Sequence, residues 1–152
     1  MPDDIIATLR RAVFASDLGE LRAKMQLWNP DDVFNLLFPM AVHEDERLPS
    51  HRATPVHRAA RLLFLVVPAS TITCEQAVGA MLPHWNHRDP ELPWYLARHF
   101  GAETTQSVVE ELRKRSLPLD QLERLRAITQ WIEKYQRYSA AEIEEMERWM
   151  TS

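Results

Sequence analysis

Signals that start an α-helix recur along this chain about every 15 to 20 residues, whereas signals for β-strands are nearly absent. At Asn29 an N-cap residue is followed by a proline and two acids, as in many helix first turns. Thr73 with Gln76 and Ser139 with Glu142 have the spacing of capping boxes. Only three glycines occur, and the Asn-Gly and Asp-Gly pairs of tight hairpins are missing. These patterns predict an all-α protein.

Length and periodicity define the domain organisation that we expect. A chain of 152 residues has the length of one domain, and no motif recurs at the fixed period of a helical repeat protein. The apolar run at 62–67 predicts a helix in the centre of the core, with a buried strand as the alternative. We therefore expect a single compact irregular bundle of about eight or nine short-to-medium helices over residues 1–152.

Composition and charge argue against several classes of function. Lys and Arg total 18 against 22 Asp and Glu, which gives a net charge of −4, and nucleic-acid binders usually carry a concentrated positive surface instead. The longest uncharged stretch, at 62–74, is shorter than the roughly 20 residues of a transmembrane helix. The single cysteine cannot form an internal disulfide, and the acidic start has no secretory signal. We therefore expect a cytoplasmic protein that binds neither membranes nor nucleic acid.

The histidines offer a metal site as an alternative. His84 and His87 stand three residues apart in the proline-rich loop 83–90, and Asp89 follows them. Together with His99 they could supply imidazole and carboxylate ligands to the metal of an enzyme or a sensor. Their spacing is not that of a helical zinc site, and the ordinary interpretation is a rigid loop with solvated histidines. We therefore assign no metal or cofactor and keep this cluster as the alternative.

A basic segment at 47–74 contains four arginines and no acid. Arg58 and Arg61, on one helical turn with His57, could bind a phosphate or the carboxylates of a partner. The alternative is that they pair with the protein's own acids, above all the glutamates of the last helix. Joined by Arg52, the same arginines would be the site of a nucleic-acid-associated regulator, which is the third and weakest option.

Catalytic signatures are absent from the sequence. Cys74 stands at a predicted helix start, where partial positive charge lowers a thiol's pKa. No Cys-His signature surrounds it, so we expect a small, buried and inert side chain. The chain also has no glycine-rich phosphate loop, zinc ribbon or Gly-x-Ser-x-Gly motif. We therefore predict that this protein is not an enzyme.

The remaining features favour binding to another protein. The acidic segment 43–46 and the last predicted helix would steer a basic partner by electrostatic attraction. An exposed Trp85 on its rigid loop would be an interface anchor, and the equal alternative is that it folds back into the core. The apolar stripe of the predicted helix 118–138 would instead support a homodimer. The residues that we expect to bind the partner are Glu44, Asp45, Glu46, Trp85, Glu144 and Glu147.

The profile of the whole chain, which is small, acidic and helical without a catalytic motif, resembles that of bacterial immunity proteins and of small phage or plasmid inhibitor proteins. The resemblance extends over the full length but involves no motif. It implies a protein that neutralises or sequesters one protein partner, such as a basic toxin or nuclease, by direct binding. Salt-sensitive association would be the mark of such a complex.

Overall fold

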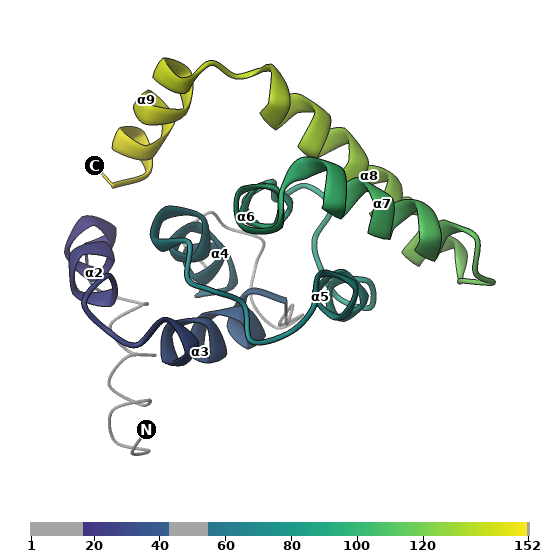
Figure 1. The fold of residues 1–152 in the computed structure, drawn as a ribbon, viewed down its shortest axis with the longest axis horizontal. Helices are drawn as coiled ribbons and strands as arrows, with labels where there is room; N and C mark the ends of the chain where they lie inside the picture. The colour runs from purple at the N-terminus through teal and green to yellow at the C-terminus, as the bar shows by residue number, and fades with distance from the viewer. Residues whose placement is uncertain (1–16, 43–54, 152) are drawn as a thin grey trace.

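The computed structural model describes residues 17–42 and 55–151, and within these ranges the chain forms α-helices and no strand (Figure 1). The prediction of an all-helical bundle is thereby confirmed. The helices, in chain order, are α2 (Leu18–Met25), α3 (Pro30–Val42), α4 (Pro55–Val66), α5 (Cys74–Met81), α6 (Glu91–Phe100), α7 (Ala102–Arg113), α8 (Leu119–Arg137) and α9 (Ala140–Thr151).

The predicted capping boxes form and fix the starts of two helices. At α5 the Thr73 hydroxyl accepts a hydrogen bond from the backbone N–H of Gln76 at 3.1 Å, and the Gln76 side chain accepts the Thr73 N–H at 3.0 Å. Ser139 and Glu142 exchange the same pair of bonds at the start of α9, at 3.1 and 3.0 Å. Each box satisfies two backbone donors that the first turn of a helix leaves without a partner. The directions of α5 and α9 are therefore set locally.

The core lies around α4, which packs between α3 and α6 (Figure 1). The apolar run of α4 is a helix, as predicted, and Leu62, Leu63 and Phe64 are fully buried. From α6 the buried Tyr95 donates its hydroxyl to the Pro68 carbonyl oxygen at 2.7 Å, so that this aromatic ring is held at both ends. None of the helices in the described ranges is long and apolar enough to cross a membrane.

The last helix folds back onto the bundle and encloses one side of it. After α8 the chain reverses, and α9 returns to lie beside α2 (Figure 1). Met150 of α9 is buried against Phe64 and Trp94 in a second, smaller core cluster. Glu147 of α9 forms an ion pair with Arg98 of α6 at 2.7 Å, and Arg22 of α2 lies 3.8 Å from the same carboxylate oxygen. Apolar burial and ion pairing thus hold α9 against three other helices.

Candidate functional site

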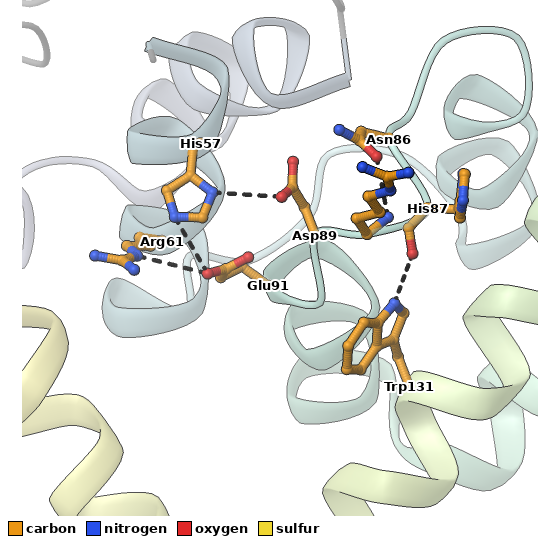
Figure 2. A network of polar contacts seen from close by, with 8 residues as sticks. His57, Arg61, Asn86, His87, Asp89, Glu91 and Trp131 are labelled. Carbon is orange, nitrogen blue, oxygen red and sulfur yellow. Dashed lines mark hydrogen bonds and ion pairs between the residues drawn. The ribbon is translucent and has the colours of Figure 1, made fainter. Parts of the chain in front are cut away.

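A histidine of α4 meets two carboxylates that lie more than thirty positions later in the sequence, at the start of α6. His57 stands in the first turn of α4, Asp89 precedes α6, and Glu91 is the first residue of α6. The His57 Nδ1 atom lies 3.6 Å from Asp89 Oδ1, and its Nε2 atom lies 3.5 Å from Glu91 Oε1 (Figure 2). One ligand atom from each residue lies within 4.8 Å of the other two. We call these three residues the His57 cluster.

A short turn brings Asp89 to this position. The Asn86 side chain accepts the backbone N–H of Arg88 at 3.0 Å, an Asx turn, and the Asn86 carbonyl accepts the N–H of Asp89 at 3.0 Å. The indole N–H of Trp131 on α8 donates to the His87 carbonyl at 2.8 Å, which ties the same turn to the bundle (Figure 2). Asp89 is therefore held by a hydrogen-bonded turn on one side and faces His57 on the other.

Burial dominates the electrostatics of the cluster. Glu91 is only 3% exposed, and burial raises the pKa of its carboxyl above the ordinary value, while the nearby His57 and Arg61 oppose that shift. Arg61 Nε lies 3.5 Å from Glu91 Oε1. The second oxygen of Glu91 is buried and accepts no hydrogen bond from any described residue. A buried carboxylate oxygen without a donor is costly, and such an atom calls for an explanation.

A pocket of about 330 Å³ opens above the cluster, between α4, α6, α8 and α9. The indole N–H of Trp94 donates to the Trp131 carbonyl at 3.0 Å and fixes the wall of the pocket. The Arg61 guanidinium stacks over the Trp149 ring at 4.8 Å, and the Lys134 ammonium lies 5.3 Å from the centre of the Trp131 ring. The aromatic residues of the lining are Trp94, Trp131, Tyr138 and Trp149, and its charged or titratable residues are His57, Arg61, Arg88, Asp89, Glu91 and Lys134.

The histidine cluster that the sequence offered as an alternative does not form among the described residues. His99 stands at the far end of α6, eight residues from Glu91 and hence about 12 Å along the helix axis. There it accepts the Ser70 N–H at 3.2 Å and stacks on Tyr95. His84 and His87 are exposed on the loop before α6. Among the described residues the possible metal ligands that converge are those of the His57 cluster.

The expectation of an exposed Trp85 is also wrong, because its side chain is 2% exposed and belongs to the main core. Its carbonyl oxygen accepts the Nε–H of Arg124 at 2.9 Å. The alternative interpretation, that Trp85 folds back into the core, is confirmed. Proline-rich loops often lie on the surface, but an indole of this size gains more by burial than by exposure.

The acidic residues expected to bind a partner have different surroundings. Glu44, Asp45 and Glu46 lie outside the described residues. Glu144 is exposed on α9, whereas Glu147 is engaged within the protein by Arg98 and Arg22. The arginines that pair with the last helix, Arg98 and Arg22, lie outside the basic segment 47–74. Within that segment Arg61 does pair with an acid of the protein, but the acid is Glu91 of α6.

Sequence reasoning missed His57 and Glu91 as parts of one site, although it considered Asp89 for a metal. The only local signal is the spacing of His57 and Arg61, which places both on one face of a helix four residues apart.

Cys74 is buried, as expected, and burial raises the pKa of its thiol, an effect that the nearby Thr105 hydroxyl partly offsets.

Comparison of the chain with protein-family models, with curated proteins and with solved structures finds no match. What the protein does has therefore to be inferred from its own side chains and their arrangement.

Proposed function

We propose that this protein is a binding protein whose ligand is a small molecule with an anionic group on a flat apolar body, held in the pocket between α4, α6, α8 and α9. The observation that carries the proposal is the pocket lining, which combines four aromatic rings with two cations, Arg88 and Lys134, that have no acidic partner among the described residues. Within the described ranges, neither Arg88 nor Lys134 has a carboxylate within ion-pair distance. A carboxylate or phosphate on the ligand would supply the missing counter-charge.

The size and polarity of the pocket support a small ligand. Its volume of about 330 Å³ is at the lower end of the roughly 300–1,000 Å³ that small-molecule sites occupy. Trp149 is 56% exposed beside it, so a flat ligand stacked there would remove apolar surface from water. Because Arg61 is already paired with Glu91, the net attraction for an anion comes from Arg88 and Lys134. The ligand's acid group would lie toward these two residues and its ring toward the tryptophans.

The binding of a protein partner is a separate prediction, and of its six residues the structure leaves Glu144 exposed. The charge of that partner would be opposite to the charge of the small ligand, because the partner would be basic and would bind the acidic surface. Charge reversal at Glu144 would weaken the binding of such a partner and leave the binding of a small anion in the pocket unchanged. The two proposals can therefore be tested independently.

Tryptophan fluorescence is the direct assay, because three of the chain's five tryptophans line the pocket. We would titrate the purified chain with indole-3-acetate and phenyl phosphate, and use indole-3-acetamide and phenol as neutral counterparts. We expect saturable binding of the anions, with the neutral compounds at least about tenfold weaker, since one charge-assisted contact contributes about 1.4 kcal/mol or more.

A matched pair of lysine variants locates the binding. Lys134→Gln should weaken the binding of the anions by about five- to tenfold, because it removes one cation from the pocket. Lys114→Gln is the control, because Lys114 is an exposed lysine at the end of α7 that pairs with Glu111 outside the pocket. Equal affinity for the anions and their neutral counterparts, or equal losses in the two variants, would show that the pocket is not an anion site.

A further inference from the structure

We infer that His57, Asp89 and Glu91 bind a divalent transition-metal ion of the zinc type at the floor of the pocket. The site differs from the histidine cluster that the sequence offered, and it does not depend on the ligand proposed for the pocket. Its residues come from two helix starts that the fold brings together, the first turn of α4 and the turn before α6 (Figure 2). Sites on such rigid elements hold their ligands in place before the ion arrives.

The separation between His57 and Glu91 matches that between two ligands of a metal, and Asp89 lies beside them. Four ligands placed tetrahedrally at the usual zinc distances of about 2.0–2.1 Å stand about 3.3–3.4 Å from one another. The His57 Nε2 atom and Glu91 Oε1 are 3.5 Å apart, too far for a hydrogen bond and close to that edge length. Asp89 faces the other ring nitrogen at 3.6 Å, a position in which a carboxylate orients a metal-bound imidazole or swings in as a ligand.

A second observation, independent of these distances, also points to a cation. The side chain of Glu91 is 4% exposed, and its Oε2 atom is buried without a hydrogen-bond donor in the described part of the chain. The hydrogen bond from Arg61 Nε goes to the other oxygen, Oε1, which is also the oxygen that His57 Nε2 faces at 3.5 Å. A bound cation would give Oε2 the partner that the described residues do not supply.

The donor set selects the class of ion. One imidazole nitrogen with two carboxylates suits zinc, manganese or iron, whereas magnesium and calcium prefer oxygen ligands throughout. Asp89 is 29% exposed and all three residues line the pocket, so the ion would be reached from solvent. At least one coordination position would then face the pocket, as in metal sites that keep an exchangeable water.

The competing arrangement is an ion triad without metal, in which a protonated His57 bridges the two carboxylates. Both arrangements bring the same three side chains together, but only the first takes up metal with a defined stoichiometry. Metal uptake therefore decides between them.

The experiment uses the full chain without an affinity tag, freed of metal by EDTA and dialysed against micromolar Zn²⁺. We expect one zinc per chain by elemental analysis, a higher melting temperature with zinc than with EDTA, and no displacement by millimolar Mg²⁺. His57→Gln and Glu91→Gln should each weaken zinc binding by at least about tenfold. The double variant His84→Gln, His87→Gln is the matched control, because it removes two exposed histidines outside the cluster.

A second readout keeps the test decisive if a buried substitution unfolds the chain. Asp89→Asn changes a partly exposed side chain and should weaken zinc binding while the helical circular dichroism stays unchanged. Co²⁺ added to the wild type should give visible absorption bands that Asp89→Asn alters. Less than about one tenth of a zinc per chain in the folded wild type would overturn the proposal in favour of the ion triad. Zinc binding lost in the double control variant and retained in His57→Gln would overturn it as well.

Discussion

Replacing Glu147 with glutamine should loosen the attachment of α9 to the bundle. Glu147 is the acid that joins α9 to α6 through Arg98 at 2.7 Å, and Arg22 of α2 lies 3.8 Å away. The substitution keeps the size and helix propensity of the side chain almost unchanged. It leaves Arg98 with its hydrogen bond to the Phe64 carbonyl at 2.9 Å and its stacking on the Phe64 ring. The expected effect is therefore the loss of the ion pair itself.

The exposure of the two side chains sets the magnitude. Pairs on the open surface contribute about 0.2–1 kcal/mol, and removing one partner of a fully buried pair costs about 3–5 kcal/mol. Arg98 and Glu147 are 24% and 16% exposed, which places them between these cases. We therefore expect Glu147→Gln to lower the free energy of unfolding by about 1–2 kcal/mol, which corresponds to a fall in Tm of about 2–8 °C for a domain of this size.

The assay is urea unfolding followed by circular dichroism, with Glu144→Gln as the control. Glu144 stands three residues earlier on the same helix and is exposed, so the control removes the same charge without the ion pair and should change stability by less than about 0.5 kcal/mol. Raising the salt concentration should reduce the difference only in part, because partly buried pairs are screened weakly. Equal losses in Glu147→Gln and Glu144→Gln would refute the conclusion that the ion pair of Glu147 with Arg98 holds α9 to the bundle.

Two further predictions concern titratable groups outside the pocket. Burial lowers the pKa of His99, whose Nε2 accepts the Ser70 N–H, so the folded state favours the neutral ring. Its contribution to stability is complete above the unfolded-state pKa of about 6.5 and is lost as the pH falls through the lower folded-state pKa. Urea unfolding between pH 7 and 5 should therefore show a smaller acid loss in His99→Gln than in the wild type, and identical slopes would contradict it. For the buried Cys74, whose thiol pKa is raised by burial, reaction with a disulfide reagent at pH 8 should be at least about tenfold slower in the folded chain than in urea. Equal rates would show that the thiol is accessible.

Most of the fold follows from local chemistry that the sequence displays directly. The two capping boxes each need residues only three positions apart, and both form as expected. The apolar run of α4 has no polar face at its end, and Leu62 to Leu65 are buried on all sides. Pro39 shows the limit of such reasoning, because we would expect it to end a helix, and α3 continues past it to Val42.

The candidate site could not be predicted in the same way, because its parts have no fixed spacing along the chain. His57 and Glu91 are separated by 34 positions, and they meet only because α4 packs against α6. The alternative histidine cluster required His99 to reach the loop 83–90 from another element, but α6 extends away from that loop and carries His99 at its far end.

The pattern of charges in the sequence does not show which acidic side chains are buried, and residues that look alike in the sequence differ in their burial. Glu144 and Glu147 belong to one acidic stretch, yet one faces solvent and the other is an internal ion-pair partner, because α9 presents only one of its faces to α6. Asp89 and Glu91 also differ in burial, with side chains 29% and 4% exposed, because Asp89 lies in the turn before α6 and Glu91 is the first residue of that packed helix. A buried acid has to be compensated within the protein or by a bound cation. Both glutamates keep one buried oxygen without a hydrogen-bond donor among the described residues. Glu147 has the Arg98 guanidinium 2.7 Å from its Oε1 atom, whereas the nearest ion-pair partners of Glu91, Arg61 and His57, are 3.5 Å away. The deeper burial of Glu91, with a side chain 4% exposed against 16% for Glu147, and its longer ion pairs are the physical reason for proposing a bound cation at the His57 cluster and a stabilising ion pair at α9.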